Sequence, residues 1–217
     1  MTVSALSAEQ LSLYNGALDI LGEEPLAEDE DRNPRRVLDR VWTRGAVNFC
    51  LSSGDWTFAT RSLQLEYEPS IDPGLGFRYA FVKPDDCVRV IAVASDGYFV
   101  DTLDQGRCVN EKNYFYCDES RIFIRYVSNA NDFGNDIGQW TRPFSAWVEL
   151  YLAYNGCNVI TGKEPDEKME RKYQSMLNGA KSKDAFNNGA KPQRMSKWVG
   201  ARLGRRGHAG NISEITE

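Results

Sequence analysis

The hydrophobic residues of this chain of 217 residues change their spacing twice between its two ends. Near the start they recur every three or four positions, at Leu11, Tyr14, Leu18 and Leu21. This spacing predicts an amphipathic helix. Ser7 can cap the start of the helix, with Gln10 at the reciprocal position of a capping box, and Gly22 can end it.

A second helix is predicted to begin at Asn33, which is followed by Pro34, because both residue types are favoured at helix starts. Its hydrophobic stripe consists of Val37, Leu38, Val41, Trp42 and Phe49. Four arginines lie off that stripe, at Arg35, Arg36, Arg40 and Arg44. The two helices are expected to form a hairpin with an acidic connecting loop.

Beyond Trp56 the hydrophobic residues alternate with polar ones, which predicts β-strands. The alternating residues Leu63, Leu65 and Tyr67 are followed by hydrophobic segments at 77–82, 88–94, 98–100, 114–117 and 121–127. Turn signals such as Asp72-Pro73-Gly74 and Asp96-Gly97 separate these segments. We expect an antiparallel β domain inserted between helices.

Helical spacing returns after Pro143, and Glu149 is the only charged residue between Pro143 and Gly162. Serine and asparagine residues within the segment make a membrane span a poor interpretation. A helix this apolar needs cover on more than one side, either from the chain's own core or from a neighbouring copy. A last amphipathic helix is expected from Asp166 to about Phe186.

Together these segments predict an α+β fold. We expect a bundle of about four helices, made of the N-terminal hairpin and two C-terminal helices, with an inserted antiparallel β domain and an extended C-terminal arm. The expected boundaries are residues 1–54 for the hairpin, 55–137 for the β domain, 138–186 for the helices that complete the bundle, and 187–217 for the arm.

The arm is rich in Gly, Lys and Arg and has too few apolar residues for a core of its own. Ordering each of its residues costs about 1–2 kcal/mol of backbone entropy, so order in the arm requires a partner surface. Its spaced apolar residues favour docking on a neighbouring subunit or another ring over a tail without a role. The candidate contact residues are Arg194, Lys197, Trp198, Arg202, Leu203, Arg205 and Arg206.

The formal net charge of −5 argues against a general nucleic-acid binder. The charges are segregated, because residues 1–31 contain acidic residues and no Lys or Arg, whereas basic residues dominate positions 181–206. The five cysteines, Cys50, Cys87, Cys108, Cys117 and Cys157, form no C-x-x-C pair. With no signal peptide recognisable at the N-terminus, we expect free thiols in a reducing cytoplasm.

Residues able to carry out catalysis are scarce. The single histidine, His208, lies among glycines in the arm, which argues against a catalytic triad or a multi-histidine metal site. Residues 129–134 faintly resemble a calcium loop, but Trp140 stands where the bidentate Glu is needed. Asp85 and Asp86 are expected to cap a short turn rather than form an acid/base pair. We expect no enzyme activity, no metal and no cofactor.

Several segments in a fixed order resemble the head-to-tail adaptor proteins of short-tailed bacteriophages, the tail tubular protein A family. The first predicted helix ends in ILGEEPL (residues 20–26), an arginine-rich helix follows, and the chain then runs into DWTFA (residues 55–59). AKSKDAF (residues 180–186) on the last helix fits the same pattern. Trp56 and Phe58 within this signature are expected to be core residues. The order of the motifs over roughly residues 9–186 carries the resemblance.

The resemblance implies a structural virion protein without catalytic activity. It implies a ring of twelve copies between the portal protein and the tail nozzle protein, with genomic DNA passing through the lumen without specific binding and with no membrane contact. Such a protein is found at the head-tail junction of the virion, and in the host cytoplasm before assembly. The long basic arm departs from the family pattern.

Acidic residues on such a ring are candidates for the channel lining, because negative walls repel DNA phosphates. The candidates are Glu28, Asp29, Glu30 and Asp31.

Three alternatives stay open. The chain could be another phage connector or tail component. A nucleic-acid-binding module would act through the arm residues Arg194, Lys197, Arg202, Arg205 and Arg206, with Trp198 stacking on a base. An enzyme with carboxylate chemistry would need two carboxyl groups about 5–10 Å apart across a cleft, and the sequence identifies no such pair.

Overall fold

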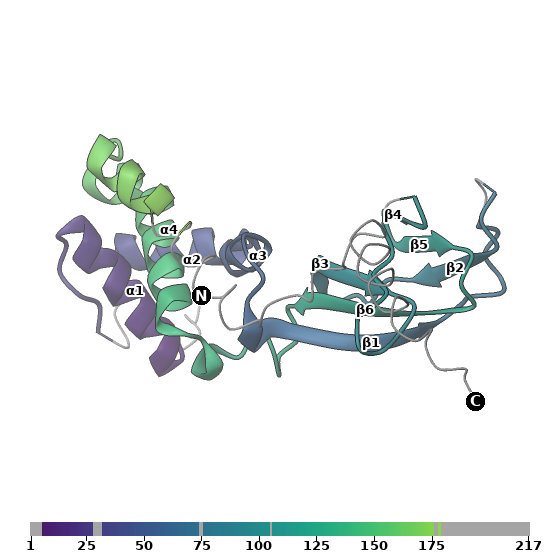
Figure 1. Cartoon of the computed structure of the whole chain (residues 1–217). Coiled ribbons are helices and arrows are strands. Elements are labelled where there is room, and N and C mark those ends of the chain that lie inside the picture. Colours follow the sequence, from purple (N-terminus) through teal and green to yellow (C-terminus); the bar gives the residue numbers. More distant parts are fainter. Residues whose placement is uncertain (1–5, 28–31, 74–75, 105, 176–177, 179–217) are drawn as a thin grey trace, which may run out of the picture.

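Helices gather at one end of the molecule and strands at the other (Figure 1). The structure is a computed structural model that describes residues 6–27, 32–73, 76–104, 106–175 and 178. These residues form an α+β fold of helices and two three-stranded antiparallel sheets. The predicted fold class is confirmed at this level.

Helix α1 (Ala8–Leu21) begins and ends where its sequence predicts. The Ser7 hydroxyl accepts a hydrogen bond from the Gln10 backbone N–H at 3.2 Å, and Gly22 ends the helix with φ 73°. The Gln10 side chain serves a different contact from the expected capping box, because it donates to the Tyr14 hydroxyl at 2.9 Å. That hydroxyl donates to Asp39 at 2.8 Å and so connects α1 to the next helix.

The predicted second helix is two helices, α2 (Asn33–Thr43) and α3 (Ala46–Ser52). Gly45 separates them with φ 97°, a conformation that glycine adopts at little cost. The prediction of one continuous hydrophobic stripe is therefore wrong beyond Trp42. Phe49 is 46% exposed and stacks on Tyr151, with ring centroids 4.8 Å apart.

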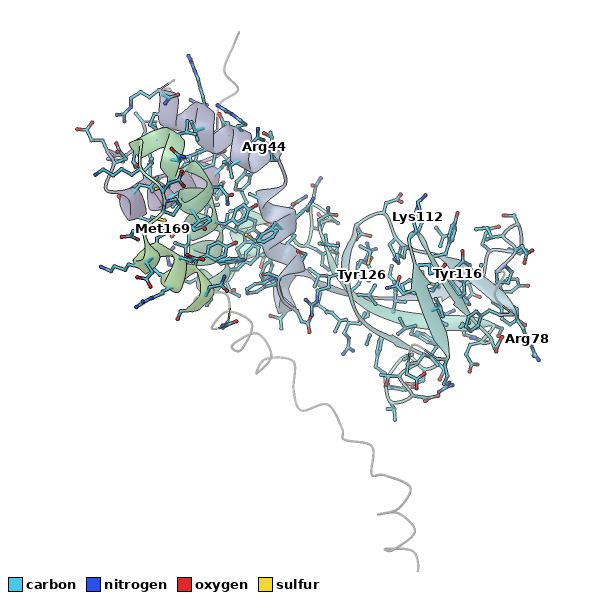
Figure 2. All side chains as sticks on the ribbon, turned by 90° about the horizontal axis from the view of Figure 1, so that it is seen from above. Arg44, Arg78, Lys112, Tyr116, Tyr126 and Met169 are labelled. Carbon is cyan, nitrogen blue, oxygen red and sulfur yellow. The ribbon has the colours of Figure 1, made fainter. Side chains whose placement is uncertain are left out.

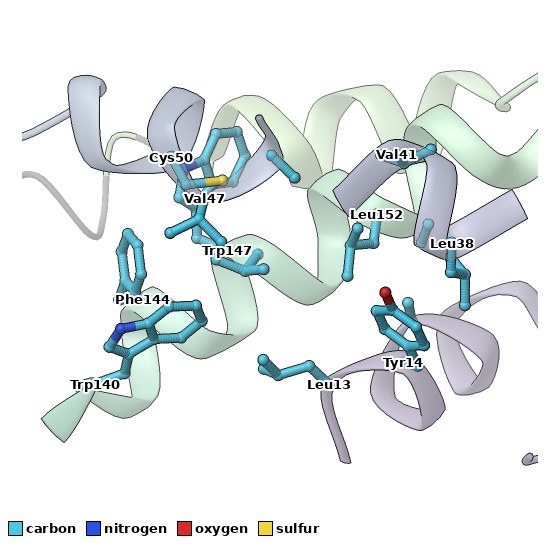
Figure 3. Packing of buried hydrophobic residues seen from close by; sticks show 14 of the residues in the cluster. Leu13, Tyr14, Leu38, Val41, Val47, Cys50, Trp140, Phe144, Trp147 and Leu152 are labelled. Atoms are coloured by element: carbon cyan, nitrogen blue, oxygen red, sulfur yellow. The ribbon is translucent and has the colours of Figure 1, made fainter. Parts of the chain in front are cut away.

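Helix α4 (Arg142–Thr161) contacts α1, α2 and α3. Its buried residues Phe144, Trp147 and Leu152 belong to a cluster with residues of all three helices (Figure 3). Residues 167–175, the main described part of the predicted last helix, are helical. Tyr173 among them packs edge-on against Trp147, with ring centroids 4.4 Å apart. The chain's own helices therefore cover these apolar residues of α4, as the core alternative requires.

The strands form two sheets that share one hydrophobic core. Sheet A has the order β1 (Thr60–Glu66), β6 (Arg121–Ser128), β3 (Cys87–Ala94), and sheet B has the order β2 (Tyr79–Val82), β5 (Tyr114–Cys117), β4 (Cys108–Glu111). Buried between them are Phe81, Cys108, Phe115, Cys117, Ile122, Ile124 and Tyr126. Every second residue along β6 contributes to this core, as expected for a strand with one buried face.

One sequence prediction about the strands is wrong, and one strand was not predicted. Residues 98–100, predicted as a strand, belong to the loop between β3 and β4. The sequence also fails to predict β4, because only Cys108 of its four residues is buried and no alternation is visible.

Trp56 lies where the helical part meets the strands. It is 1% exposed, its indole N–H donates to the Cys50 carbonyl at 3.0 Å, and its ring packs edge-on against Phe144. Phe58, in the short 3-10 helix η1 (Thr57–Ala59), packs against the same core cluster. The prediction that both aromatic residues belong to the core is confirmed.

The two parts are also joined by polar contacts. Arg89 of β3 forms an ion pair with Asp55 at 2.9 Å and donates to the Ser52 carbonyl at the end of α3 at 3.2 Å. A second 3-10 helix, η2 (Ile137–Gln139), precedes α4. No helix among the described residues is long and apolar enough to cross a membrane.

Candidate interaction surfaces

The site residues predicted from the sequence lie outside the described residues. This applies to the arm residues Arg194, Lys197, Trp198, Arg202, Leu203, Arg205 and Arg206 and to the acidic residues Glu28, Asp29, Glu30 and Asp31. The surfaces that the structure does place are built from other residues.

A loop at residues 95–101, here called the Asp96 loop, is held by one carboxylate. Asp96 accepts hydrogen bonds from the backbone N–H groups of Tyr98 at 2.9 Å, Val100 at 3.1 Å and Asp101 at 2.7 Å. The bond from Asp101 is the main cause that lowers the pKa of the Asp96 carboxyl, and the bonds from Val100 and Tyr98 add to it. The loop backbone is therefore fixed through its most exposed section.

Side chains of the loop itself and of neighbouring segments also hold the loop. Phe99 has φ 58°, which is uncommon for a non-glycine residue. The Arg125 guanidinium lies over its ring, 4.2 Å from the centroid. The Ser95 hydroxyl donates to Asp101 at 2.8 Å, and Arg107 forms an ion pair with Asp101 at 3.1 Å. An uncommon backbone conformation persists where its surroundings determine it in this way.

The Asp96 loop presents two large hydrophobic side chains to solvent. Tyr98 is 91% exposed and Val100 is 61% exposed, the highest values for large hydrophobic residues in the described part of the chain. Exposed aromatic side chains on a preorganised backbone lose little entropy when they bind, which is typical of interface anchors. The sequence predicts the turn at Asp96-Gly97 but a strand, not an exposed loop, for the residues after it.

A second surface lies on α2. Arg36 and Arg40 of α2 and Arg44, which caps its C-terminal end, are exposed and follow one another at intervals of four residues, so they lie on about the same side of the helix. We call them the α2 arginine row. Figure 2 shows Arg44 on the helical part of the molecule, at the opposite end from Arg78 and Lys112. Arg35, by contrast, is 2% exposed and lies 3.9 Å from Asp39.

Exposed acidic residues lie where α1 ends. Asp19 lies in the last turn of α1, and Glu23 and Glu24 follow Gly22; all three are exposed. We call these three residues the acidic turn. Glu24 forms an ion pair with Arg32 at 3.5 Å. One chain therefore carries a basic helix face and an acidic turn of opposite charge.

A groove of about 450 Å³ lies between the α2–α3 connection and residues 129–140. Trp42 and Trp140 stack in its wall with centroids 6.3 Å apart, and the Asn129 amide donates to the Asn48 amide oxygen at 3.1 Å. The Trp140 indole N–H donates to the Gly134 carbonyl at 2.9 Å. These groups bind one another and so hold residues 129–140 against the helices.

Residues 129–134, which faintly resemble a calcium loop in sequence, form a turn closed by hydrogen bonds. The Gly134 N–H donates to the Ser128 carbonyl at 3.1 Å, and the Asn135 side chain donates to the Asn129 carbonyl at 2.6 Å. Within residues 6–27, 32–73, 76–104 and 106–175, no group of three or more His, Cys, Asp or Glu could hold a metal ion.

Asp86 is the centre of a polar cluster inside the strand part. A turn is present at Asp85 and Asp86, as predicted. The Asp86 carboxylate accepts hydrogen bonds from Ser128 at 2.5 Å, Tyr126 at 3.1 Å and Arg61 at 3.1 Å. Burial acts to raise the pKa of Asp86, but these three donors together outweigh it and lower that pKa. No pattern in the sequence marks this cluster, since Asp86 lies 25 to 42 positions from its partners.

The described residues therefore offer contact surfaces: a fixed loop with exposed Tyr98 and Val100, and a basic and an acidic face on the helices. A scan against protein-family models found no match for the chain, and a search of curated proteins found none.

Proposed function

We propose that this protein is a structural virion protein, an adaptor ring between the portal protein and the tail nozzle of a short-tailed bacteriophage. The order of the motifs in residues 9–186 supports this proposal. The observation that carries it is the Asp96 loop, a rigid segment that holds Tyr98 in solvent with 91% of its surface exposed. An exposed aromatic side chain that projects from a fixed backbone is suited to anchoring a partner.

The proposal includes a division of the chain into parts. Residues 1–54 and 138–186 contribute a bundle of about four helices, residues 55–137 are the inserted β domain, and residues 187–217 are an arm that docks on the portal or a neighbouring subunit. Glu28, Asp29, Glu30 and Asp31 line the channel, where their charge keeps DNA phosphates from binding.

Contacts between copies follow from the charges on the helices. The α2 arginine row of one copy meets the acidic turn of the next copy, because the two surfaces are complementary in charge. Such a contact joins different surfaces of the two copies and is head-to-tail. Contacts of this kind generate rings when the rotation between copies closes. The number of twelve copies comes from the resemblance.

The test mixes the purified protein with the portal protein encoded in the same genome and images the product by electron microscopy. We expect rings attached to the portal. The variant Tyr98→Ser should weaken assembly at least about tenfold, as expected for loss of an interface anchor. Val159→Ser, which removes a side chain that is 54% exposed on α4, serves as the matched control and should assemble normally.

Two outcomes would reject the proposal. The first is a protein that forms no ring, either alone or with the portal. The second is assembly that responds equally to Tyr98→Ser and Val159→Ser, because the Asp96 loop would then have no special part in it.

A second candidate function has one specific observation in its favour. Exposed arginines at intervals of four residues on α2 could follow a phosphate backbone. A nucleic-acid-binding module would bind DNA with an affinity that falls steeply between low and physiological salt, and Arg40→Ala with Arg44→Ala would reduce that salt dependence. The adaptor proposal expects no such binding by the free protein.

A further inference from the structure

We propose that Cys108 and Cys117 are a redox-active pair that a hydroperoxide oxidises to a reversible intramolecular disulfide. All five cysteines are free in the structure. The inference is independent of the proposed function, because it depends only on the β4–β5 hairpin.

The two cysteines face each other across the hairpin. Residues Lys112 and Asn113 connect β4 to β5, and the register pairs Glu111 with Tyr114 at one end and Cys108 with Cys117 at the other. Lys112 has φ 43°, as expected at the first position of a two-residue hairpin turn with a positive φ.

The pair occupies the type of position at which a disulfide fits. The residues that close a two-residue hairpin exchange backbone hydrogen bonds, and hydrogen-bonded and non-hydrogen-bonded pairs alternate along the strands. The closing pair is Glu111 and Tyr114, and Cys108 and Cys117 form the third pair after it. Because the two kinds of pair alternate, Cys108 and Cys117 are a non-hydrogen-bonded pair. Cα atoms in such pairs lie about 4.5 Å apart, within the range of about 4.4–6.8 Å found for disulfides.

Both thiols lie on the inner side of sheet B. Cys108 is 6% exposed and Cys117 is fully buried, and both belong to the core between the sheets. The Cys117 thiol also lies 3.6 Å from the Glu119 carbonyl oxygen, to which it can donate. Cys108 is on β4, an outer strand of the sheet. Cys108 keeps 6% of its surface exposed, so it marks the side from which a small oxidant approaches the pair.

The two thiols differ in pKa, and this difference indicates which of them reacts first with the peroxide. A hydrogen bond from the Cys108 thiol is the largest cause that lowers the pKa of Cys117, and the same interaction raises the pKa of Cys108. The thiolate form is the nucleophile in thiol oxidation. Cys117 is therefore the residue that attacks first, and Cys108 is the residue that resolves the intermediate.

The other cysteines have different surroundings. Burial raises the pKa of Cys50 on α3 and raises that of Cys87 on β3 to about 11. The Cys157 thiol on α4 donates to the Lys163 carbonyl at 3.4 Å. These three residues lie on separate elements of the fold, so they serve as internal controls.

The reaction is balanced in two steps. The Cys117 thiolate attacks one oxygen of hydrogen peroxide, so that an S–O bond forms, the O–O bond breaks and the hydroxide that leaves is protonated to water. The Cys108 sulfur, having lost its proton, then attacks the Cys117 sulfenic acid, so that the S–S bond forms and the S–O bond breaks with release of a second water. Two thiols are oxidised and one peroxide is reduced to two waters.

The test uses the full-length protein with hydrogen peroxide, followed by alkylation of the remaining thiols, proteolysis and mass spectrometry. We expect one cross-linked peptide pair joining Cys108 to Cys117, a mass loss of two hydrogens, and full reversal by dithiothreitol. The variant Cys87→Ser should give the same cross-link. Absence of the cross-link in folded wild-type protein, or its loss in Cys87→Ser, would overturn the proposal.

A second variant tests the order of the two steps and does not depend on the disulfide. With Cys108→Ser, the sulfenic acid on Cys117 has no resolving thiol, and we expect dimedone to label Cys117. Circular dichroism establishes that the variant is folded. Labelling of Cys50, Cys87 or Cys157 in preference to Cys117 would contradict the assigned roles.

Discussion

The Glu149 side chain of α4 lies against Gly16 of α1 so closely that a Cβ atom at position 16 would be 2.6 Å from Glu149 Cδ. Glu149 is 8% exposed and forms an ion pair with Arg142 at 3.0 Å. The two helices can approach at this point because position 16 has no side chain. Helix α1 is therefore adapted to a carboxylate on its partner helix.

Replacement of Gly16 by Ala tests this relationship. We expect Gly16→Ala to destabilise the protein by about 1 kcal/mol, because moving Glu149 outweighs the gain of about 1 kcal/mol in helix propensity. In a Glu149→Ala background the same change should be stabilising, since the space is then open. Urea unfolding of the four proteins gives the coupling energy. An equal effect of Gly16→Ala in both backgrounds would show that the contact is unimportant.

Glu149 also predicts a dependence of stability on pH. Burial is the main cause that raises the pKa of its carboxyl, and Arg142 opposes that effect. A raised acid pKa in the folded state means that stability is lost as pH rises from the unfolded value through the folded one. We expect Glu149→Gln to gain stability relative to wild type over the pH range that begins at the unfolded pKa of 4.5 and rises toward neutrality. Denaturant unfolding across this range measures the difference, and a constant difference would contradict the assignment.

The Asp86 cluster predicts that stability depends on pH in the opposite direction. Because the folded pKa of Asp86 is lowered, its contribution is present above the unfolded value of 3.8 and is lost as pH falls through the folded value. We expect Asp86→Asn to cost about 1–3 kcal/mol at pH 7, mainly through weaker bonds to Arg61 and Ser128. The deficit should shrink below pH 3.8. Asp85→Asn changes an exposed neighbour and should have little effect at either pH.

The fold could be predicted from the sequence where local signals agree with the packing. Ser7 and Gly22 mark both ends of α1, and the hydrophobic spacing after Pro143 gives α4. The local signal misleads at residues 98–100, where a strand-like composition is overridden by backbone bonds to Asp96. Gly45 is a similar case, since its φ of 97° divides a helix that the periodicity continues.

The candidate surfaces were less predictable for a different reason. Exposure of Tyr98 depends on how the loop folds over sheet A, and the Asp86 cluster joins residues from β1, β6 and the turn before β3. Neither relationship leaves a pattern in neighbouring positions. The α2 arginines were visible in the sequence, but the burial of Arg35 among them depends on tertiary packing.

A side chain at position 134 would clash severely with its surroundings, whereas one at the nearby Gly138 would not. A Cβ at position 134 would lie 2.2 Å from the Ser128 carbonyl oxygen and 2.7 Å from Leu51 Cδ1. Because a backbone atom has to move, we expect Gly134→Ala to cost about 3 kcal/mol. Gly138→Ala, whose Cβ would meet an Asp136 oxygen at 3.3 Å, is the control and should cost less than about 1 kcal/mol. Thermal unfolding distinguishes the two, and similar midpoints would contradict this account.

A charge exchange tests the proposed contact between copies. Arg40→Glu with Arg44→Glu should abolish assembly on the portal, because the altered α2 row then repels the acidic turn of the next copy. Adding Glu23→Lys and Glu24→Lys to the same chain restores opposite charges across every interface, so assembly should return. Sedimentation velocity of the portal complexes measures both effects. Assembly that survives the first pair of changes, or that fails to return with the second, would place the contact between copies on other surfaces.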